Sequence, residues 1–140
     1  MSTPSLGRVV HYGYLWARQR DAGAVEARKD RPALIVAVRP RPGDLVLVDV
    51  APITHSSPDS PVQGIELPPA VKRHLGLDEQ RSWVIAIEYN RFVWPGYDLR
   101  RTPDGRKDYG RLSGALVRAV IERLAAHGRG GQLRRVERDD

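Results

Sequence analysis

Residues 31–50 read RPALIVAVRPRPGDLVLVDV, and this stretch decides the fold class. Two apolar runs rich in β-branched residues, at 33–38 and 45–50, flank a segment that contains Pro-Gly-Asp. Proline, glycine and aspartate together indicate a turn, and runs of this length and composition are typical of strands. Because both runs are almost continuously apolar, the pattern predicts a β-hairpin that is buried on both sides.

The base of this hairpin carries polar side chains. Arg31 opens the first run, and the second run leads into PITHS at residues 52–56. The hairpin is therefore expected to bring Arg31 and Thr54 side by side. A guanidinium group binds two phosphate oxygens through its planar fork, and hydroxyl donors beside it suit the same ligand. The sequence predicts a phosphate-binding site at this position.

The rest of the chain predicts further strands. Short strands are expected at residues 9–16, 64–67, 82–89 and 92–94, while the charged segment 17–30 is interpreted as a long exposed loop. Small, mostly antiparallel sheets of this kind usually curl into a barrel, which hides their edges.

Two helices are expected among the strands. The first begins at Pro68-Pro69 and ends at Gly76. The second is capped by Ser113 and runs to about residue 126, with apolar residues at helical spacing. Residues 1–127 are expected to form a single domain, and residues 128–140 a polar, disordered tail.

Composition narrows the functional classes. The chain has 140 residues and a formal net charge of +6, which favours nucleic acid or another polyanion as a partner. It contains no cysteine, so disulfides, thiolate nucleophiles and cysteine-based metal sites are excluded. Its four histidines have no metal-ligand spacing. No apolar run approaches the roughly 20 residues that span a bilayer, and no signal peptide is recognisable, so a cytoplasmic protein is expected.

Three stretches share the spacing of a known family. They are GYLW at residues 13–16, Glu26 followed by DRPALIV at 30–36, and VAPIT at 50–54. With a fainter echo at residues 84–94, they resemble the MazF/PemK family of bacterial toxins. Two features depart from the family: residues 68–80 look like an insertion, and residues 86–88 read AIE where the plasmid-borne branch has Arg-x-Asp.

The resemblance implies a mainly β fold with some α-helix. The expected architecture is a small SH3-like antiparallel barrel of the MazF/CcdB type, with a C-terminal helix and a short inserted helix, acting as a symmetric homodimer. The resemblance also implies an endoribonuclease toxin that cleaves single-stranded RNA at short sequences without a metal or other cofactor. A small antitoxin protein would neutralise it by blocking the RNA groove.

RNA cleavage without a metal sets three chemical tasks. A base removes the proton of the 2′-hydroxyl, an acid protonates the leaving oxygen, and hydrogen-bond donors stabilise the phosphorane. Arg31 and Thr54 suit the third task, and the resemblance transfers catalytic importance to these two positions. His55, Glu26 and Glu88 are the candidate acids and bases. Glu26 can equally orient Arg31 through a salt bridge.

Binding of RNA is expected to involve the basic segment. Arg18, Arg20, Arg28 and Lys29 form a cationic surface on segment 17–30 and, with Ser56, are the candidate RNA-binding residues.

Two other functional classes stay open. The same fold can serve as a non-catalytic interaction module, as in toxins that poison gyrase, or as a small nucleic-acid-binding barrel without a toxin role. The missing arginine and the insertion at residues 68–80 favour a non-catalytic module, and analogy of fold does not separate these classes.

Overall fold

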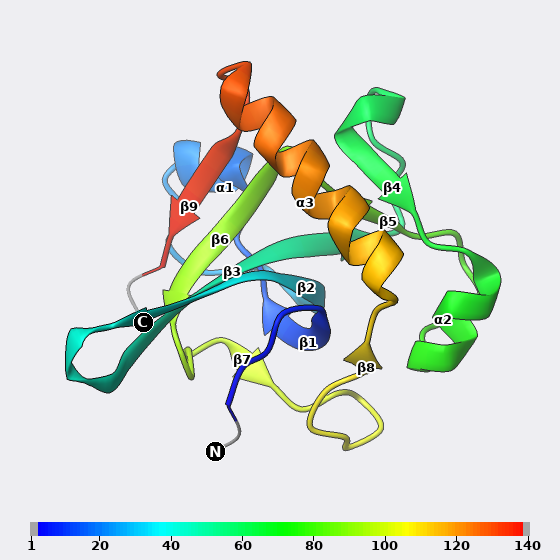
Figure 1. Ribbon diagram of the computed structural model, residues 1–140, viewed down its shortest axis with the longest axis horizontal. Helices are drawn as coiled ribbons and strands as arrows, with labels where there is room; N and C mark the ends of the chain where they lie inside the picture. The colour runs from blue at the N-terminus through cyan, green and yellow to red at the C-terminus, as the bar shows by residue number, and fades with distance from the viewer. Residues whose placement is uncertain (1–2, 139–140) are drawn as a thin grey trace.

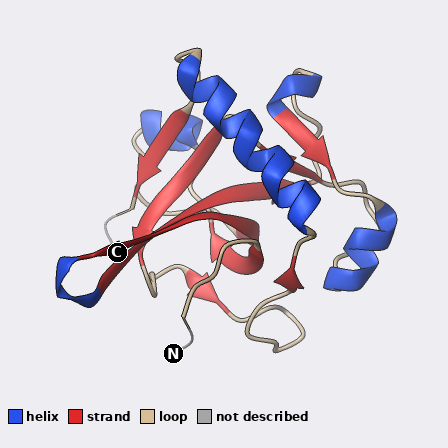
Figure 2. Ribbon diagram, viewed as in Figure 1, coloured by secondary structure: helices blue, strands red, loops and turns tan. Residues whose placement is uncertain are grey.

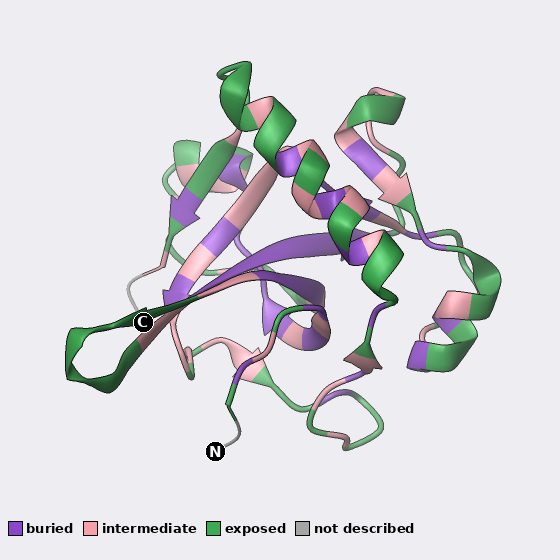
Figure 3. Ribbon diagram, in the orientation of Figure 1, coloured by how far each residue is buried: buried purple, intermediate pink, exposed green. Residues whose placement is uncertain are grey.

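The hairpin predicted from residues 31–50 is the centre of the fold. In the computed structural model, which describes residues 3–138, β2 (Asp30–Arg41) and β3 (Leu45–Thr54) run antiparallel and are joined by the turn η1 (Pro42–Asp44) (Figure 1). Pairing continues to Arg41 and Leu45, so the strands are longer than the apolar runs. A register shift between Ile35 and Ala37 marks a β-bulge, which bends the hairpin. Beyond it the tip is exposed (Figure 3).

The other strands assemble around this hairpin into one sheet, which confirms the mainly β class (Figure 2). Its main path has the order β4-β5-β3-β2-β1-β7, with β6 paired to β3, β8 paired to β1, and β9 paired to β6. These pairings leave the sheet open, and all are antiparallel except that of β6 with β9. The remaining strands are β1 (Arg8–Gly13), β4 (Gly64–Glu66), β5 (Trp83–Ile85), β6 (Glu88–Val93), β7 (Leu99–Arg100), β8 (Gly110–Arg111) and β9 (Arg134–Glu137).

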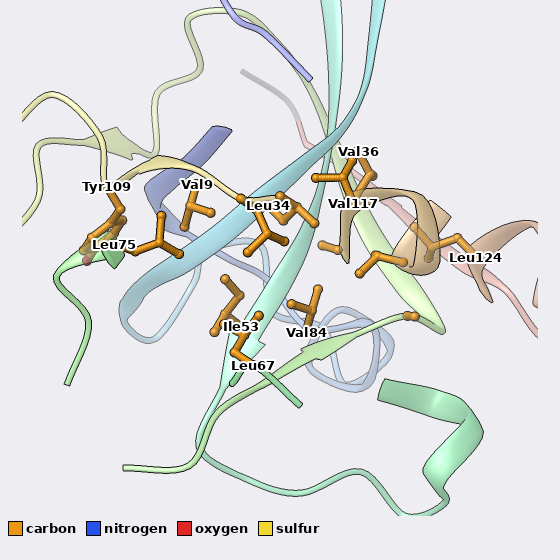
Figure 4. Packing of buried hydrophobic residues seen from close by; sticks show 14 residues of the cluster. Val9, Leu34, Val36, Ile53, Leu67, Leu75, Val84, Tyr109, Val117 and Leu124 are labelled. Carbon is orange, nitrogen blue, oxygen red and sulfur yellow. The ribbon is translucent and has the colours of Figure 1, made fainter. Parts of the chain in front are cut away.

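Two apolar clusters cover opposite faces of the base of the hairpin, which confirms the prediction of burial on both sides there, but the prediction is wrong for the tip, where Leu45 is 52% exposed. The first cluster joins Leu34 and Ile53 of the strands to Val117 and Leu124 of helix α3 (Gly114–Arg129) (Figure 4). The second cluster contains Ala33, Ile35 and Val50 of the hairpin with Tyr12, Tyr14, Trp16 and Phe92. Successive residues of β2 enter different clusters because side chains alternate across a strand. Arg31 is two residues from Ala33, and Thr54 is four residues from Val50. Because side chains alternate along a strand, Arg31 and Thr54 lie on the face of the second cluster, at its edge.

Both predicted helices are present, and a third was missed. Helix α3 is capped by Ser113, whose Oγ accepts a hydrogen bond from the backbone N–H of Leu116 at 3.4 Å. Helix α2 (Pro69–Leu75) ends at Gly76, which has a φ of +75°. The loop predicted for residues 17–30 is wrong at its start, where helix α1 (Ala17–Asp21) begins. Within residues 3–138 no helix is long and apolar enough to cross a membrane.

The prediction of a disordered tail is wrong for residues 128–138. Strand β9 pairs with β6, and Val136 is fully buried against Leu15 and Ala17 (Figure 1). The Arg138 guanidinium donates to the carbonyl of Gly13 at 2.7 Å and pairs with Asp98 at 2.6 Å. The low apolar content of this segment predicted disorder, but the buried side chains of Val136 and Arg138 hold it against the rest of the protein. Residues 139–140 lie outside the described part of the chain.

This attachment gives a testable stability effect. Val136→Ala removes two buried methyl groups and is expected to lower the free energy of unfolding by about 2 kcal/mol. Urea denaturation monitored by tryptophan fluorescence measures the change. Val25→Ala is the matched control, because Val25 is 76% exposed and should change stability by less than about 0.5 kcal/mol. An equal, small effect of both substitutions would contradict the observed packing of β9.

Candidate functional site

The base of the hairpin opens into a groove of about 770 Å³. The pairing of β2 with β3 ends at Ala33 and Pro52, and Arg31 and Thr54 lie two residues beyond this pair on their strands. Both residues line the groove, together with His55, Ser56 and Glu88. The hairpin therefore brings together the arginine and hydroxyl groups that the sequence suggested.

Arg31 lacks the partners that a half-buried arginine usually has. Its Nε atom is buried without a hydrogen-bond partner, and the structure gives Arg31 no ion pair within residues 3–138. Its Cζ lies 5.1 Å from the centroid of the Trp16 ring, a cation–π contact. Burial and then the charge of Arg18 lower the pKa of Arg31, although Tyr14 opposes them. A bound anion would supply hydrogen-bond acceptors for this guanidinium and a negative charge to balance its positive charge.

The Thr54 side chain is nearly buried at the end of β3. Its Oγ1 accepts a hydrogen bond from the backbone N–H of Ser56 at 3.2 Å. This contact orients the hydroxyl and leaves its proton available for donation to a ligand oxygen. Thr54 and Arg31 both line the groove, so each can donate to an anion bound there.

Glu88 begins β6 and is held by two donors. Its Oε1 accepts the Tyr14 hydroxyl at 3.0 Å and the backbone N–H of Ala17, the first residue of α1, at 2.9 Å. Burial, followed by the charge and hydrogen bond of Glu88, raises the pKa of Tyr14 well above its ordinary value, so Tyr14 stays a donor. Glu88 thus fixes the start of α1 beside the groove.

His55 reaches a carboxylate from the segment that follows α2. Its Nε2 lies 2.8 Å from Asp78 Oδ2, and Asp78 Oδ1 accepts from Lys72 Nζ at 2.9 Å. Sequence reasoning missed Asp78 and Lys72. A signal existed in the spacing of Lys72 and Leu75, which places a lysine on the buried face of a short helix.

Among the described residues, four cationic side chains line the groove. Arg18 has its Cζ 4.8 Å from the Trp16 ring centroid, and within residues 3–138 neither it nor the other cations that line the groove take part in an ion pair. Of the carboxylates on the groove, Asp78 and Glu88 have the partners described above. The lining cations are Arg18, Arg28, Lys29 and Arg31.

Two predicted site residues lie elsewhere. Arg20 pairs with Asp21 at 3.3 Å and donates a hydrogen bond to the carbonyl of Arg135, which links α1 to β9. Glu26 is exposed and does not line the groove. Neither residue lines the groove beside Arg31.

The groove and its surroundings define a mainly β protein with a cationic, hydroxyl-bearing site at the base of a hairpin. No protein-family model matches the chain, and no curated protein matches it in sequence. Within residues 3–138, no group of three or more His, Asp or Glu side chains is arranged to hold a metal ion.

Proposed function

We propose that this chain is an endoribonuclease toxin of the MazF/PemK type, which cleaves single-stranded RNA by attack of the ribose 2′-hydroxyl. The observation that carries the proposal is the unpartnered guanidinium of Arg31, with its orphaned Nε, opposite the hydroxyl of Thr54 in a groove. A phosphate diester satisfies both groups at once. Donors of this kind stabilise the charge that develops on a phosphorane.

The form of the groove suits a single strand of RNA. It is lined by the exposed cations Arg28 and Lys29, which can contact successive phosphates. Trp16 lies beside Arg31 and Arg18 in the groove wall. A backbone-tracking channel of this composition is typical of single-strand binders.

The same proposal covers the fold family and the partners. The order of the elements, in which a long hairpin is followed by short strands and then by helix α3, supports an SH3-like barrel of the MazF/CcdB type as the parent architecture. We further propose that the chain works as a homodimer in the cytoplasm, and that a small antitoxin inhibits it by occupying the groove.

The direct test is incubation of the purified protein with a long single-stranded RNA in EDTA. Discrete fragments with 2′,3′-cyclic phosphate and 5′-hydroxyl ends are expected, because the reaction needs only the 2′-hydroxyl as nucleophile. The same RNA annealed to its complement is the control and should be cut much more slowly. Intact single-stranded RNA with folded protein would contradict the proposal and favour a non-catalytic module, for which gyrase inhibition is the next assay.

A further inference from the structure

A chain of three polar side chains leads from the groove into the protein. His55 and Asp78 line the groove with side chains 49% and 52% exposed, whereas the Lys72 side chain behind them is only 5% exposed. The separations are 2.8 Å from His55 Nε2 to Asp78 and 2.9 Å from Asp78 to Lys72. A buried ammonium group is unfavourable unless it is paired, so the position of Lys72 requires a reason.

The arrangement fixes the carboxylate of Asp78. Lys72 also donates to the carbonyl of Gln80, and the backbone N–H of Gln80 donates to Asp78 Oδ1 at 3.1 Å. Partial burial raises the pKa of Asp78, but the hydrogen bond and charge of Lys72 and the charge of His55 outweigh it, so the pKa lies below its usual value. Asp78 is therefore ionised at neutral pH and held in one orientation.

The position of Asp78 sets the chemistry of His55. Because the carboxylate accepts at Nε2, neutral His55 carries its proton there and has its lone pair on Nδ1. A histidine oriented in this way by a carboxylate is suited to remove a proton from a hydroxyl group. The other candidates are less suited, because Glu88 Oε1 already accepts two hydrogen bonds and Glu26 lies outside the groove.

We propose that His55 is the general base of the groove and that Asp78, fixed by Lys72, is its positioning residue; this rests on the proposed endoribonuclease activity. His55 Nδ1 takes the 2′-hydroxyl proton while the 2′-oxygen forms a bond to phosphorus. The bond from phosphorus to the 5′-oxygen breaks, and the leaving oxygen takes a proton from water. The imidazolium then returns its proton to solvent. The segment 68–80, which departs from the family pattern, supplies this positioning.

The test compares kcat and KM for single-stranded RNA in wild type, His55→Ala and Asp78→Asn at neutral pH. His55→Ala should lower kcat about a hundredfold with little change in KM, and added imidazole should restore part of the loss. Asp78→Asn should lower kcat at least about tenfold, also with little change in KM, since His55 loses the carboxylate that orients it.

The kinetic test needs control variants, and other charged groups lie near His55. His74→Ala and Glu79→Gln change exposed neighbours of the same segment and should leave kcat unchanged. Other charged groups around His55 in the groove are Asp59 of its own loop, Asp30 and Arg31 of β2 with the two basic residues before them, Arg18 of α1, and Glu88 of β6.

The outcomes separate this proposal from the proposed function. Cleavage by wild type with unchanged kcat in His55→Ala overturns the role of His55 and leaves the endoribonuclease standing, whereas intact RNA with wild type overturns both. Nitrogen-15 correlation spectra give a reading independent of activity. The assignment is supported if neutral His55 carries its proton on Nε2 in wild type and if Asp78→Asn no longer prefers this tautomer. A proton on Nδ1 in wild type overturns it.

Discussion

Arg31→Ala is expected to reduce kcat for RNA cleavage about a thousandfold, with a much smaller change in KM. Arg31 is the half-buried cation opposite Thr54, and its unsatisfied Nε indicates that its hydrogen-bonding capacity is reserved for a ligand. Donors placed where charge develops stabilise the transition state more than the ground state, so their loss falls on kcat. Single-turnover cleavage of a labelled RNA measures this change.

Arg31→Lys distinguishes charge from geometry. Lysine keeps the positive charge but lacks the planar fork that binds two phosphate oxygens, so only about tenfold of the loss should be recovered. The control is Arg41→Ala at the exposed hairpin tip, which should cleave as wild type does. Cleavage by Arg31→Ala within about threefold of wild type would contradict the role proposed for the guanidinium.

The stability of Arg31→Ala provides a second reading. The side chain has no ion pair within the described residues, and its burial without full hydrogen bonding is unfavourable. Its loss removes the contact with Trp16 and breaks no ion pair of the described residues, so the free energy of unfolding should change by less than about 1 kcal/mol. A folded, inactive variant would separate a functional arginine from a structural one.

The central hairpin was predictable because its information is local. Two apolar runs and a Pro-Gly-Asp turn predict the hairpin. They do not predict the register shift between Ile35 and Ala37, which changes the side chains that share a face and brings Arg31 into register with Thr54 rather than with His55. Helices α2 and α3 were also predictable, since Pro69, Gly76 and Ser113 are terminal signals read directly from the sequence.

The remaining features depend on contacts between distant segments. Strand β9 forms because Val136 packs on Leu15 and Ala17, more than a hundred residues earlier, and nothing in its own composition predicts a strand. The partnership of His55 and Asp78 likewise requires the segment after α2 to fold back on the end of β3. The positions of Arg20 and Glu26 were not predictable, because the path of segment 17–30 depends on where α1 packs.

Glu88→Ala is expected to lower the free energy of unfolding by about 3 kcal/mol, since it leaves the buried Tyr14 hydroxyl and the backbone N–H of Ala17 without their acceptor. Helix α1 should loosen, and with it the position of Arg18 on the groove, so cleavage should also fall. Urea denaturation measures the stability, and a control substitution, Glu122→Ala on the exposed side of α3, should have little effect.

Glu88→Gln decides between an anchoring and a catalytic carboxylate. The amide oxygen of glutamine can accept both hydrogen bonds, so an anchor should keep most of its stability and most of its cleavage activity. A base or acid at this position would instead give a variant as stable as wild type but as inactive as Glu88→Ala, because an amide does not transfer the proton. Since Glu88 Oε1 is already engaged by two donors, we expect the first result, which leaves proton transfer to a different side chain of the groove.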